Sequence, residues 1–512
     1  MSRTASIPTI PTDGARVGAR GWAALAVLML PVLLVSVDNT VLSFALPEIS
    51  LALAPSGAEQ LWIIDIYPLV LAGLLVTMGT LGDRFGRRRM LLLGATGFAA
   101  VSVLAAFAPT AGLLIAARGA LGFFGAMLMP STLSLLRSIF VNRDQRRLAI
   151  AVWAAGFSAG SALGPIVGGL LLEHYSWGSV FLLAVPVLIP LLIGARLLVP
   201  ESRDPAPGRI DPISILLSML AMAPVIYAIK ALAVDGFDMK IVVLVAVGAV
   251  AGILFVRRQL RLPVPMLDMA LFRRGGFSGA ILVNLLSVVA LVGFLYFVSQ
   301  HLQLVIGLTP LAAGVVLVPG LVAMIIAGLA VVPVSRRFPP AVVVPAALAV
   351  SMIGYLLVAY STQEQGVVPL MLAFVALGIG IGAAETVSNE LILAQAPAEK
   401  VGAASAISET AYEAGAVLGT SLLGGLITAL YRGALVVPEH VPADAAAQAR
   451  ETLAGAYTAA HSLEGPVADD LWQAAVGAFE SGVTATSLIG AGLVVVAGII
   501  AALTLGRRAP AS

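Results

Sequence analysis

Long apolar segments alternate with short polar ones along almost the whole chain. A membrane-spanning helix needs about 20 predominantly apolar residues, and the segments between the apolar runs are rich in Arg, Pro, Gly or Asp. The expected spans are 22–46, 59–80, 90–108, 112–136, 148–172, 178–199, 212–232, 240–256, 276–300, 310–332, 341–360, 367–393, 401–430 and 483–506. The pattern predicts an all-α polytopic membrane protein with 14 transmembrane helices.

The placement of Lys and Arg predicts which loops are cytoplasmic. Positive residues in short loops stay on the cytoplasmic side, and counting from a cytoplasmic N-terminus puts all but five of the 29 there. The five exceptions are Arg118, Lys230, Lys240, Arg432 and Arg450. One missed helix would reverse every later loop, so we expect an even number of spans. Both tails, 1–21 and 507–512, are then cytoplasmic.

The first apolar run and one long loop near the C-terminus each predict a further feature of the chain. The first apolar run continues to Pro47, so we expect a first helix there and not a removed signal peptide. Near the other end, one long outer loop covers 431–482. Its stretches 444–460 and 469–479 predict two short amphipathic helices. A solvated hairpin is the simpler interpretation, and a lid that captures substrate is the alternative.

Composition excludes several classes of function. Of the 512 residues 60% are hydrophobic and 11% charged, against about 45–50% and 25% in a soluble domain. The chain has no cysteine, its four histidines are scattered, and no Gly-x4-Gly-Lys-Ser/Thr loop occurs. We therefore expect no metal, no cofactor, no nucleic-acid partner and no ATP-driven or enzymatic chemistry.

A compact motif joins the second and third expected spans. It reads Gly79-Thr-Leu-Gly82-Asp83-Arg84-Phe-Gly86-Arg87-Arg88-Arg89. Glycines let helices approach closely and allow a tight turn. The Asp83 carboxylate can cap a neighbouring helix or pair with an arginine in one conformation and release it in another. The motif favours a conformational gate over a plain positive loop, which would require neither the glycines nor the aspartate.

This motif resembles the cytoplasmic signature of the major facilitator superfamily. Three further segments resemble motifs of its fourteen-helix drug:H⁺ antiporter family: Val37-Asp38-Asn39-Thr40-Val41, Ala117-Arg118-x3-Gly122-x2-Gly125, and Gly160-x3-Gly164-Pro165-x2-Gly168-Gly169. The resemblance implies a six-helix bundle over 22–199, two inserted helices within 200–275, and a second bundle over 276–506. It also implies a monomer in a bacterial inner membrane, driven by the proton gradient.

The glycines of the fifth span have a physical interpretation of their own. Gly156, Gly160, Gly164 and Gly168 recur every four residues and form a smooth stripe for helix packing. The stripe suits a rocking interface between the two bundles. Static tight packing is the alternative, and Pro165 favours a mobile or kinked joint.

Charged side chains inside the expected spans are few. Each costs about 2.5–3.5 kcal/mol on insertion scales and therefore needs a reason. They are Asp38, Asp65, Arg118, Glu385, Glu390, Glu409 and Glu413. Burial and mutual repulsion raise the affinity of carboxylates for protons, so a proton can compete there with a cationic substrate.

These charges have different interpretations. Glu409 and Glu413 lie one helical turn apart and share a face, and the family pattern implies proton-coupling acids there and at Asp38 and Asp65. Asp38 is alternatively a structural partner of Arg118, and Asp65 a hydrated residue at the outer mouth. We hypothesise that Arg118 is a counter-charge for one of these carboxylates. Glu385 stays open between proton carrier and rim residue, and Glu390 is interpreted as a solvated rim residue.

A substrate cavity is expected between the bundles near the membrane midplane. Aromatic faces attract cations, and methionine adapts to varied shapes. Candidates by helix and depth are Trp62, Tyr67, Met127, Met129, Phe157, Phe294, Tyr296 and Tyr412. For each, packing in the core or against lipid is the competing interpretation.

The resemblance implies a proton-coupled multidrug exporter of amphipathic cations and zwitterions, such as dyes, quaternary ammonium compounds and fluoroquinolones. Export of one endogenous metabolite, antibiotic or lipid is an alternative that the Arg-rich, Lys-poor composition keeps open. A membrane sensor or channel is a third interpretation, from another class.

Overall fold

The structure is a computed structural model that describes residues 16–203, 211–263, 265–361, 366–396 and 401–506. Within these ranges 14 helices are long and apolar enough to cross a membrane, which confirms the predicted number. The expected tail 507–512 and most of the tail 1–21 lie outside the described residues.

The N-terminal half supplies the first six spans. They are α1 (Ala19–Leu53), α2 (Gly57–Phe85), α3 (Arg87–Ala106), α4 (Ala111–Ile139), α5 (Arg143–His174), and the pair α6 (Ser179–Leu182) and α7 (Ala184–Leu198), which together form the sixth. Local sequence sets several helix starts: Ser56 and Glu59 form a capping box at α2, and Thr110 caps α4. These caps replace the backbone partners that the first turn of a helix lacks.

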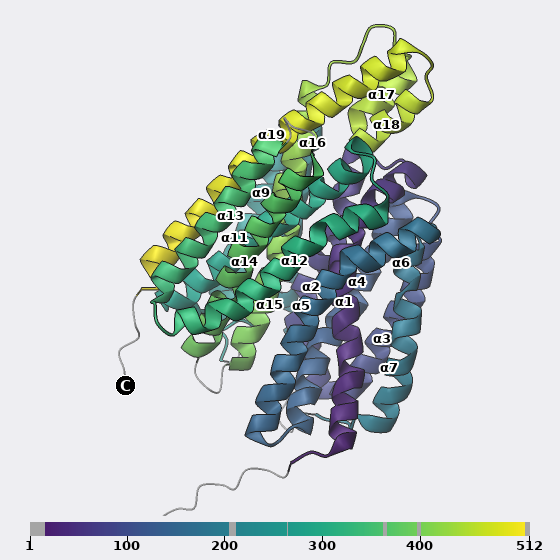
Figure 1. The fold of residues 1–512 in the computed structure, drawn as a ribbon. Coiled ribbons are helices and arrows are strands. Elements are labelled where there is room, and N and C mark those ends of the chain that lie inside the picture. The colour runs from purple at the N-terminus through teal and green to yellow at the C-terminus, as the bar shows by residue number, and fades with distance from the viewer. Residues whose placement is uncertain (1–15, 204–210, 264, 362–365, 397–400, 507–512) are drawn as a thin grey trace, which may run out of the picture.

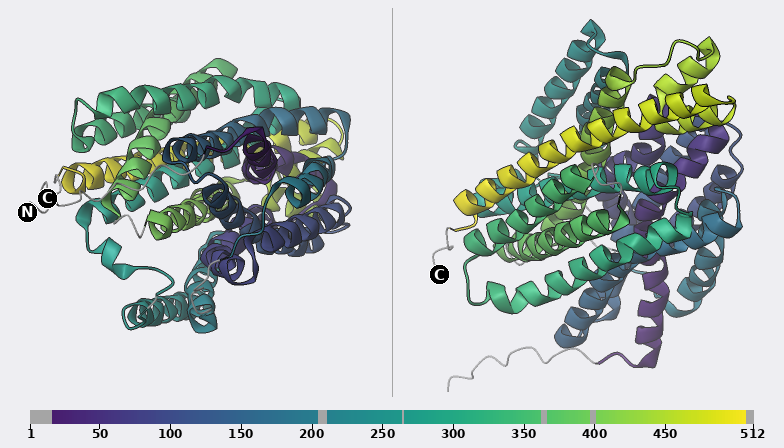
Figure 2. Two further views of the ribbon diagram at one scale, coloured as in Figure 1. Left: turned by 90° about the horizontal axis from the view of Figure 1, so that it is seen from below. Right: turned by 45° about the horizontal axis from the view of Figure 1, so that its top comes forward.

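The two spans that are expected to be an insertion are α8 (Pro212–Asp235) and α9 (Met239–Gln259), followed by the short α10 (Met269–Phe272). Figure 2 shows this pair on the outside of the bundle, where α8 packs against α2 and α16. Both helices expose many apolar side chains, as a lipid-facing surface requires.

The C-terminal half supplies the remaining six spans. They are α11 (Gly275–Gln300) with the π-helical η1 (His301–Val305), α12 (Pro310–Ser335), α13 (Pro340–Ser361), α14 (Val367–Gln395), the continuous run of α15 (Val401–Leu418), η3 (Gly419–Gly424) and α16 (Gly425–Ala434), and α19 (Pro466–Thr504). The π-helical turn η3 interrupts the thirteenth span, and such turns occur frequently at functional sites.

The outer loop differs from its prediction in two respects. The alanine-rich stretch forms two helices, α17 (Ala443–Glu451) and α18 (Leu453–His461), because Thr452 is extended and caps the second. The stretch 469–479 is not a separate helix. It forms the first turns of α19, which runs unbroken for 39 residues because nothing after Pro466 interrupts it.

The two halves contact each other mainly along three helix pairs, α5 with α12, α2 with α15, and α1 with α11. Helices α17 and α18 cover one end of the molecule, and α1 begins and α19 finishes at the other (Figure 1). We call these the hairpin end and the terminus end. Hydrogen bonds from Ser299 to the Ser43 carbonyl, at 2.6 Å, and from Gln303 to the Phe44 carbonyl, at 3.1 Å, join the halves towards the hairpin end.

Candidate functional site

An ion pair joins α1 and α4 deep inside the N-terminal half. Arg118 Nη1 donates to Asp38 Oδ2 at 2.6 Å, and the arginine is only 1% exposed. Its Nε donates to the carbonyl oxygen of Ile63 at 3.2 Å, and its guanidinium carbon lies 4.6 Å from the centroid of the Tyr67 ring. A buried guanidinium needs such partners. The structure thus pairs Arg118 with Asp38 among the candidate carboxylates.

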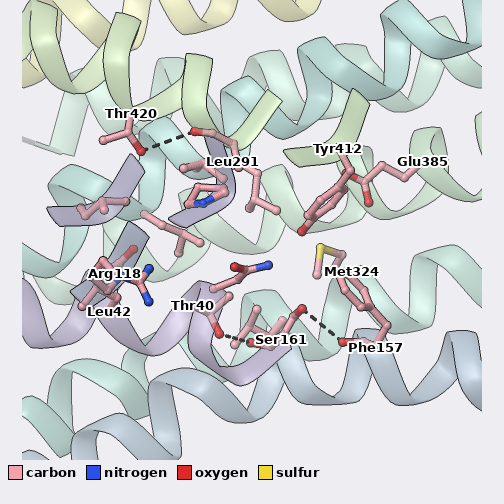
Figure 3. Close-up of a pocket in the computed structure, with 18 residues that line it drawn as sticks. Thr40, Leu42, Arg118, Phe157, Ser161, Leu291, Met324, Glu385, Tyr412 and Thr420 are labelled. Carbon is pink, nitrogen blue, oxygen red and sulfur yellow. Dashed lines mark hydrogen bonds between the residues drawn. The ribbon is translucent and has the colours of Figure 1, made fainter. Parts of the chain in front are cut away.

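A cavity lies beside this ion pair, between the two halves (Figure 3). It holds about 920 Å³ of space, counted with its open mouth. Its wall comes from α1, α2, α4 and α5 on one side, and from α11, α12, α14, α15 and η3 on the other. Most of the wall is aliphatic or aromatic, with a few polar groups that include Asn39, Arg118 and Glu385. This combination is typical of small-molecule sites.

Three of the predicted carboxylates lie on the C-terminal side of the seam between the halves. Glu385 on α14 lines the cavity, and its Oε1 atom is buried with no hydrogen-bond partner among the described residues. Glu413 on α15 is 4% exposed and accepts a hydrogen bond from Asn39 Nδ2 at 3.5 Å. Glu409 is half-buried, one turn earlier, and interacts electrostatically with Arg137 on α4. The predicted Glu409 and Glu413 pair therefore faces the N-terminal half.

Two of the eight expected cavity residues line the cavity. Phe157 on α5 and Tyr412 on α15 meet edge to face across the seam, with ring centroids 5.6 Å apart. The others do not line it: Tyr67, Met127, Met129, Phe294 and Tyr296 are buried in helix packing, and Trp62 packs against Tyr227. Helix and depth alone do not separate a cavity-facing aromatic side chain from a core one.

Asp65 is fully buried instead of standing in a hydrated mouth. Its Oδ2 lies 2.9 Å from the Nζ atom of Lys230 on the inserted helix α8. By its sequence position alone, Lys230 is only one of the exceptions to the cytoplasmic placement of positive charge. A single lysine within an apolar helix was nevertheless a detectable signal of a buried partner.

The motif at residues 79–89 forms a compact polar cluster at the terminus end. Arg87 Nε donates to Asp83 Oδ1 at 2.8 Å, so the aspartate in the last turn of α2 pairs with the arginine that begins α3. Of the two functions expected as alternatives for Asp83, the structure shows the pairing with arginine, and the capping function falls to Glu201, which accepts from the backbone N–H of Arg88 at 3.0 Å. Sequence reasoning missed Glu201, because it follows α7 and only the fold brings it to the start of α3.

The glycines of this motif serve turn and packing. Gly86 adopts φ +116°, a conformation that disfavours any side chain. Beyond the turn, a Cβ on Gly79 would lie 3.4 Å from Cβ of Pro130 on α4, and Gly82 also faces α4, near Ser131. The exposed Arg84 lies over an aromatic ring, with its guanidinium carbon 5.8 Å from the centroid of Phe85.

The glycine stripe of α5 packs mainly against α1, within its own half. A Cβ on Gly160 would lie 2.7 Å from Cβ of Ser36, while Gly156, Gly164 and Gly168 face Met29, Thr40 and Val41. The expected interface between halves occurs only at the end of the motif. There a Cβ on Gly169 would lie 2.7 Å from Cα of Leu311, and a Cβ on Gly314 would lie 2.5 Å from the carbonyl oxygen of Pro165.

Two helical bundles around a central cavity, with ion pairs buried inside them, define the architecture of a membrane transporter. The family model described as Major Facilitator Superfamily matches residues 28–420, and the chain belongs to this family.

Several relatives that are named for drug efflux or drug resistance match this chain over most of its length. The chain is 53% identical over 492 residues to the multidrug efflux pump LfrA of Mycolicibacterium smegmatis, covering 96% of this chain and 98% of the relative. It is 38% identical to the methyl viologen resistance protein SmvA of Salmonella typhimurium, with coverages of 87% and 90%. It is 32% identical to a tetracenomycin C resistance and export protein of Streptomyces glaucescens, with coverages of 96% and 93%. The chain is therefore a multi-pass membrane transporter of the drug-efflux type.

Solved structures share its fold. A bacterial homologue of the human lysosomal transporter Spinster, in an inward-facing and unoccupied conformation, superposes with a TM-score of 0.67 at 16% identity. The superposition covers 97% of this chain and 100% of the other. A mutant of the peptide transporter POT in complex with alafosfalin gives a TM-score of 0.62 at 14% identity, over 94% and 93% of the two chains.

Proposed function

We propose that this protein is a proton-coupled multidrug exporter that exchanges amphipathic cationic or zwitterionic compounds for protons. It works as a monomer in the cytoplasmic membrane of a bacterium, with both termini in the cytoplasm and no cofactor. The relatives' names support the multidrug class, and methyl viologen, in the name of one of them, is a flat organic dication.

One observation carries the proposal. The cavity between the halves combines a largely apolar wall with the Glu385 carboxylate, and Glu413 stands on the same seam. Each has an oxygen buried with no partner among the described residues. A buried carboxylate without a partner is costly unless it binds a cation or a proton. Phe157 and Tyr412 add aromatic faces for flat or cationic groups.

These groups give a mechanism of exchange. A proton and a cationic substrate compete for the same carboxylates, so binding of one releases the other. The pair of Asp38 and Arg118 borders the cavity, and protonation of Asp38 would free the guanidinium from its partner. Glu413 reaches Asn39 on α1, so loss of its charge weakens a contact that crosses the two halves. The presence of a proton or a drug molecule in the cavity is thereby linked to the relative position of the two halves.

Substitution of Glu385 and Glu413 tests the proposal. We expect Glu385→Gln and Glu413→Gln each to reduce the efflux of a cationic dye from energised cells at least about tenfold, since a charge-assisted contact is lost. Glu390→Gln is the matched control, because Glu390 is exposed on the same helix as Glu385. Full proton-driven efflux in the double variant of Glu385 and Glu413 would overturn the assignment.

A second candidate is export of one endogenous compound. The relative from Streptomyces glaucescens is named for resistance to a single antibiotic and for its export. An exporter of a single compound would not transport chemically unrelated dyes. Efflux assays with several different cationic dyes therefore separate the two functions.

A further inference from the structure

The ion pair between Asp65 and Lys230 lies outside the cavity and joins α2 to the inserted helix α8. The two side chains are 0% and 1% exposed, and their charged atoms lie 2.9 Å apart. Lys230 Nζ also donates to the carbonyl oxygen of Leu61 at 3.1 Å and lies 3.7 Å from the centroid of the Trp62 ring. The ammonium group is thus held by a carboxylate, a carbonyl and an aromatic face, all from α2.

The packing of α8 explains how a lysine reaches this place. Its exposed residues are apolar and lipid-facing, such as Leu216, Leu220 and Tyr227. Lys230 and Ile226, one turn earlier, are instead almost fully buried, and Ile226 packs with Leu69 and Val417. A charge on the inner face of such a helix is kept from lipid only while α8 stays on α2.

The C-terminal half completes the site. The Ser421 hydroxyl, in the π-helical turn η3, donates to Asp65 Oδ2 at 2.6 Å. A Cβ on Gly425 would lie 3.2 Å from Cβ of Ala233, so α16 also contacts α8 beside the ion pair. Asp65 is consequently where the N-terminal half, the inserted helix and the C-terminal half meet, nearer to the hairpin end of α2 than to its other end.

We propose that Lys230 is the fixed counter-ion of Asp65, and that this pair positions α2 against η3 to close the hairpin end. In this arrangement Asp65 does not carry the exchanged proton, because its charge is already matched by Lys230 of the inserted helix α8. When the halves separate, the Ser421 contact breaks while Lys230 stays with α2. The inserted helix is then a working part of the transporter, and this inference rests on the proposed exchange function.

A cycle of substitutions tests the pair. Removing one member of a buried ion pair leaves an uncompensated charge, whereas removing both is often tolerated. We expect Asp65→Asn and Lys230→Met each to lower dye efflux at least about tenfold, and the double variant to recover to within about threefold of the unsubstituted protein. Efflux by the double variant should still be abolished by a protonophore. Lys230→Arg should retain most of the rate because the charge remains.

The matched control is Lys240→Met, since Lys240 pairs with Asp238 at 3.6 Å on the exposed end of α9. It should leave efflux unchanged. A double variant as inactive as Asp65→Asn would show that Asp65 has a role of its own and would overturn the proposal. Single variants as active as the unsubstituted protein would also overturn it. Failure of the exchange function itself would appear differently, as loss of drug-driven proton movement in the unsubstituted protein.

A distance measurement separates positioning from general stability. The chain has no cysteine, so Ala52→Cys on α1 and Ala434→Cys on α16 can be spin-labelled without background at the hairpin end. Each single charge variant should shift the distance distribution towards larger separations, at an unchanged yield of folded protein, and the double variant should reverse the shift. Distributions that stay the same in all three would contradict the positioning role.

Discussion

Arg118 has several partners that only a guanidinium group can contact at the same time. It donates to Asp38 and to the Ile63 carbonyl and lies over the Tyr67 ring. A lysine ammonium keeps the charge but loses the planar fork. We expect Arg118→Lys to reduce the efflux rate about tenfold or more, since each charge-assisted bond contributes about 1.5–3 kcal/mol.

The measurement is initial dye efflux at equal expression, with Arg196→Lys on the exposed face of α7 as the control. An Arg118→Lys variant that transports at the rate of the control would show that the planar geometry of the guanidinium group is not needed. Only a positive charge would then be required at this position.

The charged residues of the spans show how much of the site could be predicted from the sequence. Asp38 and Arg118 were predictable because a charge in an apolar span requires a reason. Their pairing, and the pairing of Asp65 with Lys230, depend on which helices become neighbours. Lys230 was missed because α8 belongs to neither six-helix half, and no local pattern indicates which helix it packs against.

The glycine stripe allows α5 to pack closely on α1. A Cβ on Gly160 would lie 2.7 Å from Cβ of Ser36 and 3.0 Å from the Leu33 carbonyl oxygen, which is closer than side-chain contacts normally permit. We expect Gly160→Ala to lower the unfolding free energy by about 1–3 kcal/mol through overpacking. Thermal unfolding in detergent measures the change.

Gly477→Ala in α19 provides the comparison, because a Cβ there meets nothing within 4 Å. It should leave stability unchanged or raise it slightly, since alanine favours helix. A Gly160→Ala protein as stable as this control would show that α1 and α5 can separate without cost.

Asp211 links α8 to α9 at the terminus end of both helices. It caps α8 through Ser214 and accepts two hydrogen bonds from Arg258, at 2.8 and 3.0 Å. The hydrogen bonds from Arg258 lower the pKa of Asp211 to about 2. The stabilisation is therefore fully present above the unfolded pKa of about 4 and is lost as the pH falls towards 2.

We expect Asp211→Asn to lower the melting temperature at pH 7, with a difference from the unsubstituted protein that shrinks below pH 4. Melting curves across this range measure it, and Asp238→Asn in an exposed ion pair is the control. A difference that stays constant with pH would mean that the ionised carboxylate contributes nothing.

Element boundaries were predictable where local chemistry sets them. Apolar length predicted all 14 spans, and Thr110 and Ser56 are recognisable caps. The long extension of α19 was not predicted, because polarity suggested a surface helix at 469–479. Polarity reports exposure, and a helix that leaves the membrane can continue into water without a break.

At the scale of the whole molecule, the described contacts favour one end. Three of the hydrogen bonds that join the halves, from Ser299, Gln303 and Ser421, lie at or beyond the depth of the cavity towards the hairpin end, and the bond from Asn39 to Glu413 lies beside the cavity. This places the closed side of the transporter at that end. The expected division into two halves and an insertion came from resemblance and counting, whereas the closed side depends on long-range contacts that no sequence pattern reveals.

The central claim is that drug movement through the cavity is exchanged for protons. The most direct test reconstitutes the purified protein in liposomes with an acidic interior and a trapped pH dye, then adds a dicationic viologen outside. The account predicts that the drug alkalinises the interior, that transport saturates, and that Glu385→Gln with Glu413→Gln abolishes both. Loss of the pH gradient without drug would indicate a channel. Drug uptake with no proton movement would contradict the account.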